Sequence, residues 1–522
     1  MIRCLRWSWL LAVFLVVCPA QADDVFALYR QIQATIDAWH PEDGLDLLEK
    51  LRSSAPDAPE THMASARLAF ELGRYDDAAE EMGRFIELIG DTSRYGELAE
   101  LYRETARRTR GMQTYRSDRF LIHFQPGLDE IIAPFAAETL ERQLDALQQD
   151  LGYTIPKAAL PIRVEIYPKV LDFVAVSTLT EKEVETSGTV ALCKFNRLMI
   201  VSPRRMARGY KWRDTLGHEL VHFVVSRMTR NRAPLWLHEG VAKFEERRWR
   251  SERIGDLHPI QESILAEARR KDTWVPFNQM MPSLAKLDSG WKTSLAFAEV
   301  TLLVRQLVVD GGMPRLRAAI EAFSESPEAG YRFLGVSTLD QLWQQFLARV
   351  AGETFNPVPG YRFIPPSVAE DPDLAEPEPV EQREGRKYVR LGDLLRREGH
   401  WSAALTEYTK AVDAIGHKPA PVGLRIAEAL ITGARYPQAE QELLELLVRD
   451  PDRATAHWLL GKIALLRGDA ATALQRYETA FAIAPFHREV LAGLVEAAEA
   501  AGDREQLKRY RKALERFDEL NS

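Results

Sequence analysis

The last third of the sequence repeats itself about every 34 residues. The segment Gly399–Leu405 recurs as Gly468–Leu474, an intermediate copy begins at Gly433, and a fourth begins at Gly502. A period of this length predicts one helix pair per unit, and such units bury their apolar faces only by stacking on one another. The repeat therefore constrains this part of the chain to an all-α solenoid.

The repeated unit resembles the tetratricopeptide repeat (TPR). The small residues Ala404, Ala439 and Ala473 hold the same place in successive copies, and a proline closes two of the units. The resemblance implies about four TPR units over residues 385–522. It also implies a concave face that binds a protein partner or a peptide.

A weaker copy of the pattern occurs near the N-terminus. Gly73–Ala79 has the same turn followed by small residues, and Gly44 lies 34 residues before Ala78. We interpret residues 23–110 as about two degenerate TPR-like units. A plain helical bundle is the alternative interpretation.

Residues 1–22 have the pattern of a secretory signal peptide. Two arginines precede the apolar run Trp7–Val17, and small residues frame a cleavage site after Ala22. This predicts an exported protein, in the first instance periplasmic. An uncleaved anchor and a lipid anchor on Cys18 are the alternatives, although the apolar run is shorter than the roughly 20 residues that span a bilayer. No later stretch is apolar enough for a transmembrane span.

Charge and cysteine content exclude two classes of protein. The chain has 68 Lys and Arg against 76 Asp and Glu, a net charge of −8, so it lacks the basic excess of a bulk nucleic-acid binder. Signal cleavage leaves Cys193 as the last of three cysteines, so the mature chain has no intramolecular disulfide. We expect Cys193 to be a small buried apolar residue. A catalytic thiol is the alternative.

Residues 111–354 have mixed periodicity. Four apolar or alternating runs predict short strands, at residues 119–124, 162–167, 190–193 and 197–201. From Arg213 onward the pattern is helical, so the block predicts an α+β domain. Residues 355–384 hold seven prolines and several acidic residues, which predicts an extended linker before the C-terminal repeats.

The helical part opens with the pattern His-Glu-x-x-His, from His218 to His222. On a helix the two histidines lie one turn apart on the same face. This spacing lets both imidazoles reach one Zn²⁺ ion, and Glu219 projects beside them, where it can take a proton from a water molecule. Two histidines that satisfy each other in the core are the alternative.

A catalytic zinc site needs a third protein ligand. Pro234 is well placed to begin a second helix, which carries Glu239 sixteen residues after the first motif. The two motifs together, His218–His222 and Pro234–Ala242, resemble the gluzincin zinc metallopeptidases, and more narrowly the bacterial peptidase-MA-like domains. That resemblance implies a zincin-like fold, a Zn²⁺ cofactor, and a peptide or protein substrate.

Carried over residue by residue, the resemblance makes His218, His222 and Glu239 the metal ligands and Glu219 the general base. His238 competes with Glu239 for the third position. On one helix the two side chains point about 100° apart, so we do not expect both to bind one metal.

The sequence departs from that group at two positions. Lys243 stands where many relatives have an acidic residue, so the partner of a ligand histidine must come from elsewhere; Glu245 and Glu246 are the candidates. Phe297 stands where relatives often have a tyrosine that could stabilise an oxyanion. Tyr210 and His258 are candidate replacements for that hydroxyl.

Two functions follow from these observations. The first is an exported zinc metallopeptidase that hydrolyses peptide bonds with Glu219 as general base and recruits substrates or partners through its repeats. The second is a catalytically weak or inactive TPR scaffold with a peptidase-like domain. Phe297 is the residue that weakens the first expectation.

Overall fold

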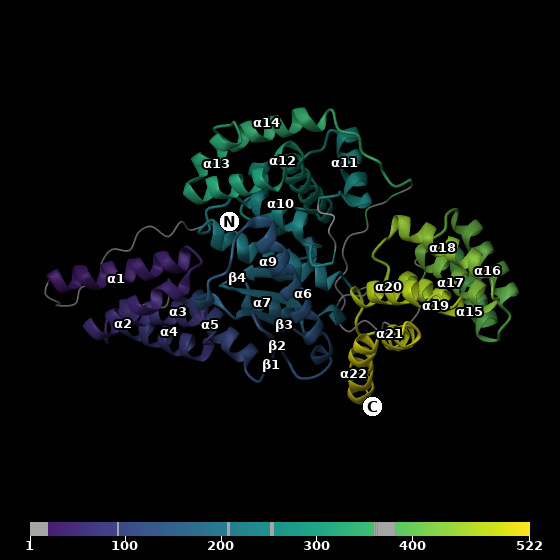
Figure 1. Cartoon of the computed structure of the whole chain (residues 1–522), viewed down its shortest axis with the longest axis horizontal. Coiled ribbons are helices and arrows are strands. Elements are labelled where there is room, and N and C mark those ends of the chain that lie inside the picture. Colours follow the sequence, from purple (N-terminus) through teal and green to yellow (C-terminus); the bar gives the residue numbers. More distant parts are fainter. Residues whose placement is uncertain are drawn as a thin grey trace. The chain divides into compact units, whose positions relative to one another are not determined.

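The computed structural model describes residues 19–90, 93–205, 209–250, 255–359, 361, 363, 380 and 382–521. These residues form two compact units (Figure 1). The first unit contains the described residues of 19–202 and 214–356, with residue 363. The second contains those of 203–213, 357–361 and 380–521. Most of the predicted signal peptide and residues 364–379 of the predicted linker lie outside the described residues.

The first unit begins with a layer of helices over the region of the degenerate repeats. Helix α1 packs on α2 and α3, α3 packs on α4, and α4 packs on α5. Gly73 joins α3 to α4 with a φ of +74°, and a Cβ there would lie 1.9 Å from the guanidinium carbon of Arg163. Glycine takes this left-handed turn without strain and leaves room for the Arg163 guanidinium. The elements are α1 (Pro19–Asp37), η1 (Pro41–Gly44), α2 (Leu45–Ser54), α3 (Pro59–Glu71), α4 (Tyr75–Ile89) and α5 (Gly96–Thr109).

A five-stranded sheet follows, in the order β1-β2-β3-β5-β4. Strand β3 is parallel to β2 and to β5, whereas β1 and β4 are antiparallel edge strands. Phe195 and Asn196, with φ of 56° and 53°, form the two-residue turn between β4 and β5. The strands are β1 (Gln113–Arg116), β2 (Phe120–Phe124), β3 (Ile162–Tyr167), β4 (Ala191–Lys194) and β5 (Arg197–Val201).

The sequence predicted four of these strands to within a residue or so and missed β1. All four residues of β1 are exposed, so this strand has no alternation of apolar and polar residues to reveal it. The observed sheet is small and mixed, and the helices that follow it make the unit mainly helical.

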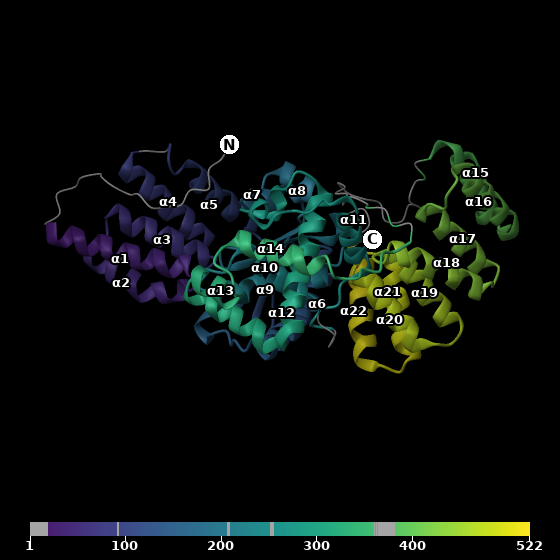
Figure 2. The same cartoon turned by 90° about the horizontal axis from the view of Figure 1, so that it is seen from above.

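The helices that lie between the strands and after them in the chain complete the first unit (Figure 2). Helix α6 packs on β2, and α12 packs on α10, α11 and α13. Helix α12 is interrupted at Gly311 and Gly312, where the backbone leaves the helical region. The elements are α6 (Asp129–Leu151), η2 (Lys157–Ala159), α7 (Val170–Val176), α8 (Glu181–Ser187), η3 (Pro203–Arg205), α9 (Trp212–Met228), α10 (Leu235–Glu245), α11 (Pro259–Lys271), η4 (Phe277–Met280), η5 (Leu284–Lys286), α12 (Gly290–Glu325), α13 (Pro327–Phe333) and α14 (Leu339–Val350); η3 and the first two residues of α9 belong to the second unit.

A buried charged network joins the N-terminal helices to the sheet. The Arg197 and Glu165 side chains are each 1% exposed and form an ion pair of 3.1 Å. Tyr75, from α4, donates its hydroxyl hydrogen bond to the same Glu165 carboxylate. The Arg197 guanidinium also lies over the rings of Phe70 and Tyr75, at 4.9 and 4.8 Å. The network makes the N-terminal helices part of the same body as the sheet.

The second unit contains the predicted C-terminal repeats, and each of its helices packs on the next along the chain. Ala404, Ala439 and Ala473 are fully buried at the helix–helix contacts, as expected for the small residues of the repeat. In the intermediate copy Ala434, with a φ of +53°, takes the left-handed position that Gly399 and Gly468 take elsewhere. That copy therefore starts one residue later than Gly433. The helices are α15 (Arg383–Arg397), α16 (Trp401–Ile415), α17 (Ala420–Thr432), α18 (Tyr436–Arg449), α19 (Ala454–Leu466), α20 (Ala470–Phe481), α21 (Arg488–Ala500) and α22 (Arg504–Leu520).

A distant segment, residues 209–213, packs within this second unit. The Tyr210 amide donates to the Ile483 carbonyl at 3.1 Å, and the fully buried Trp212 indole donates to the Phe481 carbonyl at 3.1 Å. Lys211 pairs with Asp452 at 2.6 Å. This segment therefore belongs to the same unit as the C-terminal repeats, and the N-terminal helices belong to the same unit as the sheet.

Across the part of the chain that the structure describes, no helix combines the length and apolar content that crossing a membrane requires.

Candidate metal centre

The His-Glu-x-x-His segment lies in the first half of α9, a helix that is buried around most of its circumference. Its apolar positions are all 1% exposed or less: Leu216, Leu220, Phe223 and Val224. His218 and His222 are one turn apart, with side chains that are 10% and 15% exposed. The helix therefore buries its apolar face and leaves both imidazoles a narrow access to solvent.

Helix α10 brings Glu239 to the two histidines. Pro234 precedes the helix at its N-cap, so the helix begins at Leu235, one residue later than predicted. Gly240 lies against α12, where a Cβ would stand 2.6 Å from a methyl carbon of Val304 and 2.7 Å from the Val300 carbonyl oxygen. The glycine after Glu239 therefore allows α10 to pack closely on α12, and that packing fixes the position of Glu239.

Three side-chain atoms converge at this point. The Nε2 atoms of His218 and His222 are 3.1 Å apart, and each lies 3.4 Å from Oε2 of Glu239. One nitrogen or oxygen from each of the three residues lies within 4.8 Å of the others, an arrangement that could hold a metal ion. The structure therefore brings together the three residues that the sequence singled out as ligands.

The electrostatics of the group follow from this crowding. Burial alone would lower the pKa of His218, but the Glu239 and Glu246 carboxylates outweigh it and raise the pKa to about 9. Burial alone would raise the pKa of Glu239, but the two histidines hold it well below its usual range. A cation that binds to these atoms must therefore displace a proton from His218.

Glu246 is the acidic partner of His218. Its Oε2 atom lies 3.4 Å from Nδ1 of His218, on the side of the ring away from Glu239. Lys243 donates a 2.9 Å hydrogen bond to the same oxygen. Lys243 therefore holds the Glu246 carboxylate beside His218. The i, i+3 spacing of Lys243 and Glu246 is a sequence signal for this pair.

Glu245, the other candidate, serves a different site. It is fully buried, and its neighbours are Asp150 and Arg248. Burial, followed by the Asp150 charge, raises the pKa of Glu245 to about 8. The prediction that left Glu245 and Glu246 open is thus resolved in favour of Glu246 as the neighbour of His218.

Glu219 is buried on the same helix, next to edge strand β4. It is 5% exposed and accepts a hydrogen bond from the backbone amide of Cys193. Burial raises the pKa of Glu219, because a carboxylate removed from water is less stable than the neutral acid. Cys193 itself is half-buried, rather than fully buried as expected, and burial together with the Glu219 charge raises the pKa of its thiol well above the usual value. A thiol with a raised pKa is a poor nucleophile, so the geometry does not favour the catalytic alternative.

The remaining candidate residues occupy different places. The His238 ring lies 5.7 Å from the His222 ring but outside the ligand group, and burial lowers its pKa to about 3. The Phe297 ring packs edge-to-face on His218 at 6.3 Å, so an apolar ring forms one wall of the site. His258 instead caps α11, where its Nδ1 accepts from the Ile260 amide. Tyr210 belongs to the second unit.

Comparison with known proteins identifies the repeats. A family model described as tetratricopeptide repeat matches residues 29–85 and 424–488. The comparison with curated proteins found no match. A solved structure described as the crystal structure of the P58(IPK) TPR domain matches at 12% identity, with a TM-score of 0.22, over 93% of this chain and 94% of that chain. A TM-score this low carries no weight for a shared fold. The family model therefore supports the predicted tetratricopeptide repeats in both flanking regions of the chain.

Proposed function

We propose that the protein is an exported TPR scaffold that carries a zinc-dependent peptide-hydrolysing site at His218, His222 and Glu239. The repeats favour protein partners, because stacked helix pairs present an extended binding surface. The hydrolytic part rests on the geometry of the three side chains and on the position of Glu219.

One observation carries the metal assignment: the spacing of the three donor atoms. At the usual zinc–ligand distances of about 2.0–2.1 Å, the edges of a tetrahedron are about 3.3–3.4 Å long. The three observed separations are 3.1, 3.4 and 3.4 Å. Oε2 of Glu239 is also buried without a hydrogen-bond partner among the described residues. Two imidazoles and one carboxylate are a donor set that suits Zn²⁺ and leaves a position for a water molecule or substrate.

The roles of the chain's own groups follow from their positions. Zinc, when bound, would polarise a peptide carbonyl and make a water molecule more acidic. Glu219 would take the proton of the attacking water and later deliver it to the leaving amine. Its buried position and raised pKa support both steps, because the carboxyl group must hold the proton between them. Glu246, held by Lys243, would keep the His218 ring in its ligand orientation.

The free edge of the sheet supports a peptide as the substrate. Strand β4 is the edge strand next to Glu219, whereas β5 is an interior strand between β3 and β4. An extended peptide can add to an exposed edge through backbone hydrogen bonds. Because β5 is paired on both sides, β4 is the strand of this pair to which a peptide could add.

Metal analysis combined with two variants tests the proposal. The purified mature protein should hold one zinc per chain, and His222→Ala should lose most of it. Glu219→Gln should keep the zinc and slow hydrolysis of a cleaved library peptide by about 10²–10⁴-fold. Stoichiometric zinc in His222→Ala, or equal hydrolysis by Glu219→Gln, would overturn the assignment.

A scaffold without turnover is the second candidate, and Phe297 is the observation that favours it. Phenylalanine cannot donate a hydrogen bond to an oxyanion, and the repeat family is what the comparisons detect. If the wild-type protein binds zinc but cleaves nothing in a broad peptide library, Phe297→Tyr is the discriminating variant. If that change creates peptidase activity, the wild-type domain is a peptidase that has lost its activity. The protein would then act as a scaffold.

A further inference from the structure

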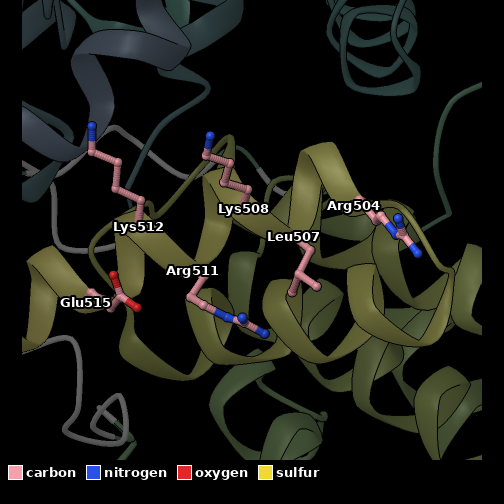
Figure 3. Close-up of a pocket in the computed structure, with 6 residues that line it drawn as sticks. All are labelled: Arg504, Leu507, Lys508, Arg511, Lys512 and Glu515. Carbon is pink, nitrogen blue, oxygen red and sulfur yellow. The ribbon is translucent and has the colours of Figure 1, made fainter.

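Helix α22 ends the second unit and presents a basic face. On one side Tyr510 and Ala513 are buried, and the Tyr510 hydroxyl donates to Glu478 of α20 at 2.9 Å. The other side carries Arg504, Lys508, Arg511 and Lys512, all exposed, around the half-buried Leu507 (Figure 3). We call these five residues the α22 basic face.

The four cations share one side of the helix. Their spacing of i, i+4, i+7 and i+8 places them within about a third of the helix circumference. Among the described residues, no carboxylate lies within ion-pair distance of any of them. By contrast, Arg516 on the same helix pairs with Glu519 at 2.9 Å.

This arrangement works against the helix itself. Like charges at i and i+4, as at Arg504 and Lys508, destabilise a helix by a few tenths of a kcal/mol per pair. The same repulsion acts between Lys508 and Lys512. The chain as a whole carries a net charge of −8, so the cations are not part of a general basic excess. Their clustering therefore points to a ligand rather than to helix stability.

The groups around the face define the chemistry of that ligand. The five residues, with Glu515 one turn further along, line an open hollow of about 370 Å³. Guanidinium and ammonium groups bind carboxylates, and Leu507 offers one apolar contact between them. Arg504 and Lys512 are about 12 Å apart along the axis, the length of about four residues of extended peptide.

We propose that the α22 basic face binds a short acidic segment of a protein partner, with at least three carboxylates and one apolar side chain. This names the partner chemistry for the scaffold part of the proposed function and rests on that part alone. A lipid surface fits less well, because an interfacial helix needs a broad apolar face and this face has one leucine.

Peptide binding to the full-length mature protein tests the proposal. The probe is a fluorescein-labelled octapeptide with four Glu, one Leu and three Gly, and the control probe has Gln in place of Glu. All proteins carry Glu219→Gln, so the readout is binding by fluorescence anisotropy and does not depend on hydrolysis. Failure here is thereby distinguishable from failure of the hydrolytic proposal.

Lys508→Glu/Lys512→Glu should weaken binding of the acidic peptide about tenfold or more, because two attractive charges become repulsive. Lys387→Glu/Arg390→Glu on α15 makes the same change in net charge and should leave binding unchanged. Binding should also weaken with added salt. If the reversal disturbs folding by circular dichroism, Lys508→Gln/Lys512→Gln provides the same comparison with less perturbation.

Three results would overturn the proposal. The first is no binding of the acidic peptide by the parent protein at millimolar concentration. The second is equal affinity in the Lys508/Lys512 variant. The third is binding of vesicles of anionic phospholipid, lost in that variant, without binding of the peptide, which would assign the face to a membrane surface.

Discussion

The N-terminal repeats contact the rest of their unit partly through buried charges, whereas the C-terminal repeats pack on one another mainly through apolar residues. The ion pair between Arg197 and Glu165 has both side chains 1% exposed. Within the second unit, by contrast, the pair Arg488–Asp518 is 56% and 44% exposed. The N-terminal repeats thus belong to the same unit as the sheet, whereas the C-terminal repeats form a unit of their own.

This difference indicates which set of repeats is better suited to bind an exchangeable protein partner. Buried ion pairs add little net stability, but they demand one arrangement, since an unpaired buried charge is costly. The N-terminal helices contact buried charges at two places: the Tyr75 hydroxyl donates to the Glu165 carboxylate, and Glu42 forms an ion pair with the fully buried Arg227 at the end of α9. The C-terminal repeats, as a unit of their own, are the better candidates for exchangeable partners.

The largest expected effect comes from breaking the first of these contacts. Glu165→Ala leaves Arg197 buried and unpaired, so it should lower the unfolding free energy of the first unit by about 3–5 kcal/mol. Asp518→Ala, which breaks the exposed pair in the second unit, should cost less than about 1 kcal/mol. Chemical denaturation of both variants measures the contrast, and equal costs would remove the distinction between the two sets of repeats.

Trp212 tests whether the second unit needs its distant segment. Trp212→Phe keeps a ring against Phe481 but leaves the buried Phe481 carbonyl without its indole donor. We expect the second unit to lose about 1–3 kcal/mol of unfolding free energy. Thermal unfolding followed in each unit checks this, and an unchanged second transition would show that residues 385–522 are stable without the segment.

Two adjacent carboxylates, Glu246 and Glu245, should differ in their effect on zinc affinity. Glu246→Gln removes the carboxylate beside Nδ1 of His218, so zinc affinity should fall about 10–100-fold, as measured by competition with a chelator. Glu245→Gln, one residue earlier, should leave zinc affinity unchanged. Zinc should raise the melting temperature of the first unit alone, because ligand binding stabilises only the unit that holds the site.

The smallest expected effect is a pH dependence confined to the first unit. Folded Glu245 keeps its proton up to about pH 8, against a usual pKa of 4.5. The folded state therefore binds more protons between these values, so the stability contributed by Glu245 is full below about pH 4.5 and is lost as the pH rises to about 8.

Glu245→Gln should accordingly flatten the fall in first-unit stability between pH 5.5 and 8.5, by on the order of 1 kcal/mol. The change is modest because Asp150 and Glu245 share one site and Arg248 offsets part of the charge. Melting temperatures of the variant and the wild type at the two pH values measure it. A wild-type slope that persists in Glu245→Gln would assign the dependence to another group.

Local patterns predicted much of this architecture. The 34-residue period predicted the C-terminal helix pairs, and the two motifs predicted which three residues converge near the sheet. The intermediate repeat was displaced by one residue because Ala434, not Gly433, has the left-handed backbone. A glycine nearby is a strong but not a unique signal for that conformation.

Contacts between distant segments could not be predicted in the same way. The bond from the Trp212 indole to the Phe481 carbonyl joins residues 269 positions apart, and neither residue carries a sequence pattern that names the other. The choice between Glu245 and Glu246 also depended on how α10 ends, because one residue of difference turns a side chain by about 100°. Such outcomes are decided by tertiary packing.

Helix α9 carries both histidines, and its C-terminal end is fixed within the first unit. There Arg227 is held by Glu42 and His40 of the N-terminal helices. From His222 to Arg227 there are five residues, about 7.5 Å of helix. A change in the packing of the N-terminal helices would therefore reach the histidines through little more than one turn of helix. The angle between His222 and Glu239 and the seating of Arg227 are thus properties of one element.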